Sequence, residues 1–299
     1  MARASWSLEH FDRFLNVYNG YASSVFQAVC RLSGQRVALK VYQADKLHVI
    51  SQQQLMREAR MHPTLDHPNI VNMYASFRQV SASCTAGASP CMHVSVITSS
   101  SALQQDRISF ALAVCKSHIS SHHSHTLTGC ILLHTQGGLV VLVMEWCNGG
   151  SLLEKYLERG SRVSETMAVL VTRQMASALS YLHGMHIIHR DVKLENIVLM
   201  NKVADEMTGR METTYKLADF GLSINHTVER SVTRAGTGNY MAPEVLRCPM
   251  KSLPEENKDR EDLAYDCSAG QWTRSRLICS PAAQCHTSPF WKICLDTNS

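Results

Sequence analysis

The residues with the most chemical content lie in two short stretches of the chain. The first, His189-Arg190-Asp191-Val192-Lys193-Leu194-Glu195-Asn196, combines carboxylate, ammonium and amide groups, and the second, Asp219-Phe220-Gly221, adds another carboxylate. Carboxylate and amide oxygens are hard ligands of the kind that bind magnesium. A carboxylate beside a substrate hydroxyl can also act as a base. The separation of the two stretches predicts two loops that face each other across one nucleotide site.

Two further motifs complete the pattern, because Val37-Ala38-Leu39-Lys40 precedes these stretches and Ala242-Pro243-Glu244 follows them. Four such motifs in this order resemble the eukaryotic protein kinases. The resemblance implies an α+β, two-lobed fold with a small β-rich N-terminal lobe and a helical C-terminal lobe. It also implies an enzyme that uses ATP and Mg²⁺ and phosphorylates protein substrates.

The resemblance implies a role for each polar residue of the catalytic stretches. Phosphoryl transfer needs alignment of the nucleophile and neutralisation of phosphate charge more than it needs covalent help. Asp191 is expected to accept the proton of the substrate hydroxyl or to orient that hydroxyl, and Lys193 to direct its ammonium group at the transferred phosphate. Asn196 and Asp219 are the expected magnesium ligands.

Lys40 is expected to contact the α- and β-phosphates of ATP. An acid on the following helix should hold it in place, and Glu58, in Leu55-Met56-Arg57-Glu58-Ala59, is the candidate with the best spacing. The alternative is that Glu58 is an exposed glutamate on the helix surface.

The loop that should cover the phosphates matches the family pattern G-x-G-x-x-G-x-V only in part. With Val25 at the end of the pattern, its three glycine positions hold Tyr18, Gly20 and Ser23. Gly20 lacks a Cβ, so the backbone could still approach the phosphates there. A turn with a structural role only is the alternative for this hairpin.

The expected adenine site follows from the strand that ends at Met144. By resemblance Met144 is the gatekeeper residue, and the backbones of Glu145 and Cys147 hydrogen-bond the edge of the base. The residues expected to sandwich the ring are Val25, Ala38 and Val198. Such apolar residues would belong to the core in most folds, so this interpretation depends on the motifs around them.

The substrate class follows from two places in the sequence. Lys193 and the run Gly236-Thr237-Gly238-Asn239-Tyr240 resemble serine/threonine kinases, whereas tyrosine kinases differ at both. Thr237 is expected to hydrogen-bond Asp191 and Lys193 and so to help hold the acceptor hydroxyl.

A regulatory site is expected between Asp219 and Glu244, where activation loops are phosphorylated. A phosphate on Thr233 could pair with Arg190 and order the loop, and the arrangement is similar to that of Aurora-type kinases. A passive Thr233 is the alternative.

The elements that must position these residues follow from local patterns. Strands are expected at residues 14–18, 24–29, 35–42, 70–77 and 139–144, with a hairpin turn at Asn19-Gly20. A helix is expected at 51–61, ended by Pro63, and a short one at 151–157. A long helix should begin at the N-cap Ser164 and carry an apolar face formed by Met167, Leu170, Val171, Met175 and Leu179.

Two segments do not fit this pattern. Residues 80–136 are rich in serine, histidine, cysteine and threonine without any period, and their deletion would leave Gln79-Gly137-Gly138 as a compact turn. We interpret this insert as an intron read through in frame, with an inserted loop as the alternative. From about Gly270 the resemblance ends. The sequence therefore predicts an N-terminal lobe at 1–143, an incomplete C-terminal lobe at 144–269 and an unrelated disordered tail at 270–299.

Composition sets the remaining expectations. A formal net charge of +4 is too small to indicate a nucleic acid or a membrane surface as a partner. No apolar run is long enough for a membrane span and the first residues lack a signal core, so a cytoplasmic or nuclear protein is expected.

The incomplete lobe leaves two alternatives to an active kinase. The chain could be a non-catalytic protein-binding module of kinase-like fold, or a mis-spliced product without a function of its own. Intact Lys40, Asp191, Asn196 and Asp219 favour a catalytic lineage.

Overall fold

The computed structural model describes residues 6–79, 138–205, 210–253 and 255–265. The chain divides into two units. The first contains the residues up to Gln52 together with Ala59–Leu65 and Asn72–Trp146, and the second contains Gln53–Glu58, Asp66–Val71 and the residues from Cys147 onward. Strands dominate the described part of the first unit and the longest helix belongs to the second, so the expected α+β class is confirmed.

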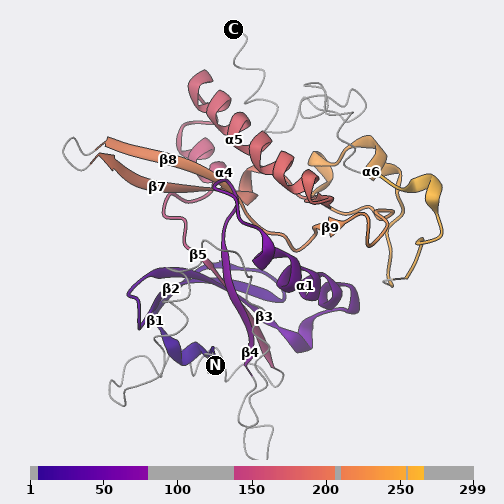
Figure 1. The fold of residues 1–299 in the computed structure, drawn as a ribbon, viewed down its shortest axis with the longest axis horizontal. Helices are drawn as coiled ribbons and strands as arrows, with labels where there is room; N and C mark the ends of the chain where they lie inside the picture. The colour runs from indigo at the N-terminus through magenta and orange to yellow at the C-terminus, as the bar shows by residue number, and fades with distance from the viewer. Residues whose placement is uncertain (1–5, 80–137, 206–209, 254, 266–299) are drawn as a thin grey trace, which may run out of the picture. The chain divides into compact units, whose positions relative to one another are not determined.

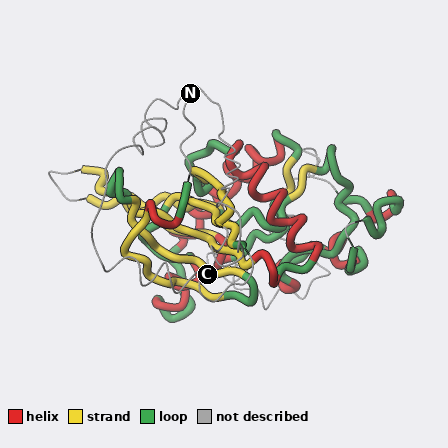
Figure 2. Tube along the Cα trace, turned by 90° about the horizontal axis from the view of Figure 1, so that it is seen from below, coloured by secondary structure: helices red, strands yellow, loops and turns green. Residues whose placement is uncertain are grey.

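The first unit is built on one antiparallel sheet of five strands (Figures 1 and 2). The strands are β1 (Phe11–Asn19), β2 (Ser23–Cys30), β3 (Arg36–Gln43), β4 (Met73–Gln79) and β5 (Leu139–Glu145). Their order in the sheet is β1-β2-β3-β5-β4. Each strand agrees with an expected one to within a few residues.

Alternation along β3 gives this sheet two different faces. Val37, Leu39 and Val41 lie on one face and are buried, with exposed fractions of 0%, 0% and 4%. They form the core of the unit with residues of the neighbouring strands and of the chain before β1, which are Trp6, Leu8, Phe11, Phe26, Ala28, Cys30, Ala75, Phe77, Leu139, Val141 and Val143. Burial of each large side chain stabilises the unit by roughly 1.5–3 kcal/mol. Ala38 and Lys40 lie on the opposite face.

The hairpin between β1 and β2 differs from the expected turn at Asn19-Gly20. Asn19 is the last residue of β1 and pairs with Ser24, so the connection consists of residues 20–22. The side chain of Asn19 explains this extension, because its Oδ1 accepts hydrogen bonds from Asn16 Nδ2 at 2.8 Å and from Ser24 Oγ at 2.9 Å. Gly20 N–H closes the turn by donating to Ser23 O at 2.7 Å.

Strands β4 and β5 meet at the point where the chain departs from the family pattern. Gln79, the last residue of β4, pairs with Leu139, the first of β5. The intervening insert, 80–136, and the tail, 270–299, lie outside the described residues. Their interpretation as an intron and a foreign tail therefore remains a prediction.

Helix α1 (Val49–Met61) begins two residues before the expected start and ends where Pro63 predicts. Leu55 and Ala59 lie on its buried face, whereas Met56 is 53% exposed. Met56 is exposed because successive positions on a helix point about 100° apart, so it does not share the face of Leu55.

The second unit contains helices α4 (Leu152–Glu158), α5 (Glu165–Gly184) and α6 (Pro243–Arg247) and strands β6 (Ile187–Ile188), β7 (Ile197–Asp205), β8 (Arg210–Leu217) and β9 (Ile224–Asn225). Ser164 caps α5 as expected, since its Oγ accepts from Met167 N–H at 3.3 Å. Four of the five expected apolar residues of α5 are buried, namely Met167, Val171, Met175 and Leu179. Helix α5 packs on β8 (Figure 1), where Gln174 Oε1 accepts from Tyr215 N–H at 2.7 Å.

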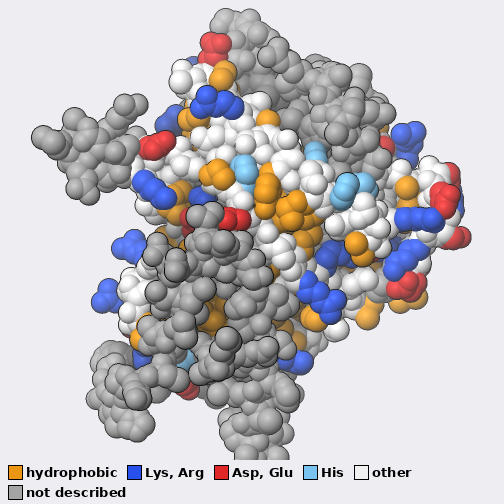
Figure 3. Space-filling model, viewed as in Figure 1, with side chains coloured by type: hydrophobic (Ala, Val, Ile, Leu, Met, Phe, Trp, Pro, Cys, Tyr) orange, Lys and Arg blue, Asp and Glu red, His pale blue; other side chains and the backbone are white. Residues whose placement is uncertain are grey.

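The charged run 255–262 forms ion pairs at the surface. Lys258 contacts Glu255 at 2.8 Å, and Arg260 contacts Asp262 at the same distance. Figure 3 shows acidic and basic side chains interspersed in this part of the chain. None of the helices in the described ranges is long and apolar enough to cross a membrane.

Candidate active site

A short two-stranded sheet brings the two chemically rich stretches together in the second unit. Ile187 and Ile188 of β6 pair with Asn225 and Ile224 of β9, so the chain enters the catalytic loop beside the segment that follows Asp219. A second link joins the loops further on, where Ala218 N–H donates to Asn196 O at 2.8 Å. The residues just before and just after the two motifs are therefore held in a fixed register.

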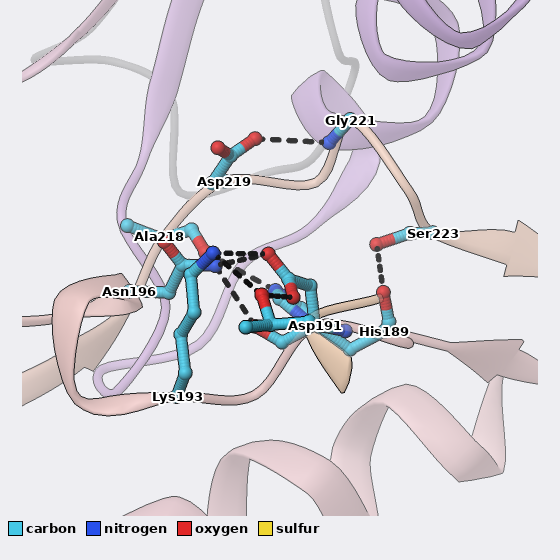
Figure 4. Close-up of polar contacts among 9 residues, drawn as sticks. His189, Asp191, Lys193, Asn196, Ala218, Asp219, Gly221 and Ser223 are labelled. Atoms are coloured by element: carbon cyan, nitrogen blue, oxygen red, sulfur yellow. Dashed lines mark hydrogen bonds and ion pairs between the residues drawn. The ribbon is translucent and has the colours of Figure 1, made fainter. Parts of the chain in front are cut away.

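Asp191 is the centre of the site (Figure 4) and only 8% of it is exposed. Its Oδ1 accepts from Thr237 Oγ1 at 2.7 Å. Its Oδ2 accepts from Asn196 Nδ2 at 3.0 Å and lies 2.9 Å from Lys193 Nζ. Lys193 Nζ also donates to Thr237 Oγ1 at 2.9 Å, which closes a ring of three side chains. Donors on both oxygens fix the orientation of the carboxylate.

His189 holds the same loop in place through hydrogen bonds to the backbone, although its motif alone does not suggest this role. Its Nε2 lies 3.1 Å from Ala218 O, and its Nδ1 accepts from Asp191 N–H at 3.3 Å. The ring is buried and stands edge-on to Phe220 at 4.9 Å. Burial lowers the pKa of His189 to about 4, so the ring is neutral at physiological pH. The neutral tautomer with hydrogen on Nε2 satisfies both contacts, and His189 thus ties the two loops together.

Asn196 and Asp219 have the chemistry of magnesium ligands. Asn196 uses its Nδ2 for two hydrogen bonds, to Asp191 O at 2.8 Å and to the Asp191 carboxylate, which orients its amide oxygen as the ligand atom. Asp219 has a left-handed backbone with φ of 62°, and its Oδ1 accepts from Gly221 N–H at 3.2 Å. One amide and one carboxylate fit Mg²⁺, which retains water and phosphate ligands. Among the described residues, no group of three or more His, Cys, Asp or Glu could hold a metal ion.

Two glycines explain how backbone segments approach this centre. Gly236 has φ of 126°, and a Cβ there would lie 2.4 Å from Arg190 O, so only glycine lets the segment with Thr237 lie against the catalytic loop. A Cβ on Gly221 would lie 3.2 Å from Asp219 Oδ1 and 3.4 Å from Glu58 Oε2. Glu58 is fully buried and therefore not a glutamate of the exposed helix surface.

The first unit gathers four of the expected nucleotide residues on one face of its sheet. Val25 on β2 pairs directly with Lys40 on β3, and Ala38 pairs with Met144 on β5. Directly paired residues point to the same face, as do residues two apart on one strand. Val25, Ala38, Lys40 and Met144 therefore share the face opposite the core. Lys40 Nζ lies 5.3 Å from the centre of the Tyr42 ring, and its pairing with Glu58 remains a prediction.

Two other residues of the expected adenine site, Glu145 and Cys147, lie at and just after the end of β5. Glu145 N–H donates to Asn72 O at 2.9 Å. In the second unit Cys147 precedes Gly149, whose N–H donates to Leu199 O at 2.8 Å. Val198 lies on β7 and bridges Ser151.

The two expected regulatory residues contact other groups. Arg190 Nε donates to Leu222 O at 2.5 Å. Thr233 is buried, with an exposed fraction of 9%, and its carbonyl accepts from Tyr265 Oη at 2.9 Å. Phosphorylation of Thr233 would therefore require this segment to open first.

Comparison with known proteins places the chain in context. A family model described as "Protein kinase domain" matches residues 15–139 and 118–258, in two segments that overlap in and beside the atypical insert. Serine/threonine-protein kinase 33 of Mus musculus is 42% identical over 109 residues, which cover 35% of this chain and 22% of that protein. Aurora kinase of Schizosaccharomyces pombe is 39% identical over 142 residues, 48% of this chain and 34% of that protein.

A longer but weaker match extends over most of the chain. Myosin-IIIa of Mus musculus is 28% identical over 260 residues, which is 85% of this chain but 12% of that protein. The chain thus spans well under half the length of each of these relatives.

Proposed function

This chain belongs to the protein kinase family, whose members use ATP, typically with Mg²⁺, and we propose that it transfers the γ-phosphate of ATP to serine and threonine hydroxyls of proteins. The observation that carries this proposal is the closed ring of Asp191, Lys193 and Thr237. A carboxylate held by donors on both oxygens is prepared to receive or orient a hydroxyl without first rearranging.

In the proposed mechanism, Asp191 Oδ1 or Oδ2 accepts a hydrogen bond from the substrate hydroxyl and aligns its oxygen with the γ-phosphorus. Lys193, 2.9 Å from Asp191 Oδ2, balances the negative charge that develops on the transferred phosphate. Mg²⁺ held by Asn196 and Asp219 would neutralise further phosphate charge. The hydroxyl of Thr237 contacts both Asp191 and Lys193 and so helps to hold the acceptor hydroxyl in place. This arrangement supports serine or threonine as the acceptor.

We assign nucleotide binding to two groups of residues. The phosphates are assigned to Lys40, with Glu58 as its partner, and to the turn that contains Gly20. The adenine is assigned to the sheet face of Val25, Ala38 and Met144, with the backbones of Glu145 and Cys147 and the side chain of Val198. The common face of the first set supports this assignment.

The remaining assignments are regulatory and cellular. We propose that Thr233 is phosphorylated and that the phosphate pairs with Arg190 after the segment opens, as the likeness to Aurora kinase suggests. We also propose the cytoplasm or nucleus as the location, with proteins as the partners and neither nucleic acids nor membranes among them.

The test is phosphate transfer by the full chain and by Asp191→Asn, measured with γ-labelled ATP, Mg²⁺ and a basic protein acceptor. Asparagine keeps the size of the side chain but cannot take a proton, so we expect kcat to fall by at least about a hundredfold. Binding of a fluorescent ATP analogue should change by less than about threefold, because Asp191 is assigned to the hydroxyl and not to the nucleotide.

The matched control is Asp262→Asn, since Asp262 is an exposed acid paired with Arg260 and not with a residue of the ring. It should leave transfer unchanged. Transfer that survives in Asp191→Asn would refute the mechanism. A full chain that binds the ATP analogue but transfers no phosphate would instead identify a non-catalytic module.

A further inference from the structure

The ammonium group of Lys40 lies against an aromatic ring in the first unit. Lys40 Nζ is over the face of the Tyr42 ring, 5.3 Å from its centre. Both side chains are half-buried and belong to β3. Tyr42 lies outside the motif that ends at Lys40, so no sequence pattern gives it a role. Because residues two apart on a strand share a face, Tyr42 belongs to the nucleotide face. This is the sheet face opposite the core, which carries Val25, Ala38, Lys40 and Met144.

The register of the sheet places Tyr42 at the end of this face that is nearest the β1–β2 turn. Tyr42 pairs with Ser23, which follows the turn that contains Gly20. The next residue of β3 donates its N–H to Ala22 O of the same turn at 3.0 Å. The step from Lys40 to Tyr42 along β3 therefore leads toward the turn to which the phosphates are assigned.

The contact determines where the ammonium group lies on this face. Side chains of a strand stand roughly perpendicular to the sheet, and residues two apart are separated by roughly 6.8 Å along the strand. At 5.3 Å the ammonium of Lys40 is closer to the ring of Tyr42 than this separation, so the two side chains converge. Ser23 and Val140 pair with Tyr42 on its two sides and leave its ring less room to rotate. The ring thus draws the ammonium toward the turn.

We propose that Tyr42 is a positioning residue, whose ring holds the Lys40 ammonium at the turn end of the nucleotide face, where it meets the phosphates of ATP. The attraction depends on the face of the ring and not on the hydroxyl, because the ring quadrupole attracts the cation. A lysine side chain loses rotamer freedom when it is fixed, so a ring that fixes it before the nucleotide arrives reduces the cost of binding. This inference rests on the proposed function for the role of Lys40, whereas the contact itself can be measured alone.

The first experiment measures the contact without any nucleotide. In the full chain with isotope-labelled lysine, a ring over the ammonium moves the nuclear magnetic resonance signal of the Lys40 Cε protons upfield. Lys40→Arg identifies that signal by removing it. We expect the upfield signal in the wild type and in Tyr42→Phe, which keeps the ring. It should return to the ordinary lysine position in Tyr42→Leu, and a signal that Tyr42→Leu does not move would refute the contact.

The second experiment measures whether the contact helps to bind phosphate. Dissociation constants of ATP, ADP and adenosine are determined for the wild type, Tyr42→Phe and Tyr42→Leu by competition with a fluorescent ATP analogue. Tyr42→Leu should weaken the binding of ATP and ADP by about three- to fivefold. Adenosine should stay within about twofold, because it carries no phosphate for Lys40 to contact. Tyr42→Phe should bind all three as the wild type does.

Two controls separate positioning from a general loss of structure. Tyr74 of the same unit packs against the core, so Tyr74→Leu should lower the melting temperature without a selective loss of ATP. In a Lys40→Met background, Tyr42→Leu should not weaken ATP further, because the ring has no ammonium to hold. A merely structural Tyr42 would weaken ATP equally in both backgrounds. If Tyr42→Leu does not fold, Tyr42→Val, which suits a strand, takes its place.

The binding results distinguish this inference from the proposed function. Equal weakening of ATP and adenosine in Tyr42→Leu would refute positioning. Tighter binding of ATP would refute it as well, because the ring would then hold the ammonium away from the phosphates. A wild type that binds ATP with the expected dependence on Tyr42 but transfers no phosphate would refute the proposed function and leave the inference intact. A wild type that binds neither ATP nor ADP would refute the nucleotide assignment and the role of Tyr42 together.

Discussion

Some residues of the site act through their charge and others through hydrogen bonds of a neutral side chain, and His189 belongs to the second group. Its motif position predicts a catalytic loop but does not say that the ring is neutral. The structure gives the reason, because the ring is buried and both nitrogens contact the backbone, Nε2 as donor to Ala218 and Nδ1 as acceptor from Asp191. Sequence reveals the residue type, whereas burial decides its charge.

This neutrality predicts a pH dependence of stability. The folded pKa of about 4 lies below the ordinary value of 6.5, so the folded state resists protonation that the unfolded chain accepts. The contribution of His189 is therefore fully present above pH 6.5 and is lost as the pH falls toward 4. Between pH 7 and 5, protonation of His189 in the unfolded chain should lower the free energy of unfolding by about 2 kcal/mol.

His189→Gln isolates this contribution from other titrating groups. Glutamine keeps one donor and one acceptor but does not titrate, so its unfolding free energy should fall by about 2 kcal/mol less than that of the wild type between pH 7 and 5. Urea unfolding at both pH values measures the difference. Equal losses in the two proteins would show that His189 accepts a proton in the folded state.

Among the elements, those with local signals could be predicted and those made by distant contacts could not. The cap at Ser164 and the end of α1 before Pro63 depend on a few neighbouring residues, and both were predicted. The extension of β1 to Asn19 depends on side-chain contacts across the hairpin. The pair of Arg57 with Glu229 depends on the completed fold, so no local pattern indicates it.

The segment from Gly236 to the short turn at Gly238–Tyr240 provides a prediction at this scale. Gly236→Ala should lower kcat by at least about tenfold, because a Cβ would lie 2.4 Å from Arg190 O and the backbone has φ of 126°. The displaced segment would carry Thr237 away from Asp191. Gly238→Ala is the matched control, since a Cβ there meets nothing within 4 Å.

Phosphate transfer and thermal unfolding, measured on both glycine variants, distinguish a displacement of Thr237 from a general loss of stability. Gly236→Ala should lose activity out of proportion to its stability, whereas Gly238→Ala should match the wild type in both. Equal activity in the two variants would show that the close approach to Arg190 has no part in catalysis.

For the molecule as a whole, the sequence predicted the α+β class, because the class follows from the motifs, whereas the roles of the site residues stay predictions. The compact turn expected on deletion of residues 80–136 implies that the strands on either side are neighbours, but the sequence could not reveal their register. The structure pairs Gln79 with Leu139, so the two strands meet in register although a long stretch of chain separates them. The pairing therefore depends on core residues such as Phe77 and Val141 and not on a local turn.

That register predicts that residues 80–136 can be removed. Their deletion joins Gln79 to Gly137, and Gly137-Gly138 then form a two-residue hairpin connection before Leu139, which suits the flanking pair. Closure of a long connection costs entropy, so the deletion should raise the unfolding free energy by roughly 2–3 kcal/mol while β4 and β5 keep their protected amides. Urea unfolding and hydrogen exchange measure both. Deletion of 80–138 is the matched control, because no residue remains to turn the chain and the pairing of β4 with β5 should be lost. If the shorter deletion also abolishes cooperative unfolding, residues 80–136 are an integral part of this kinase domain and not an interruption of it.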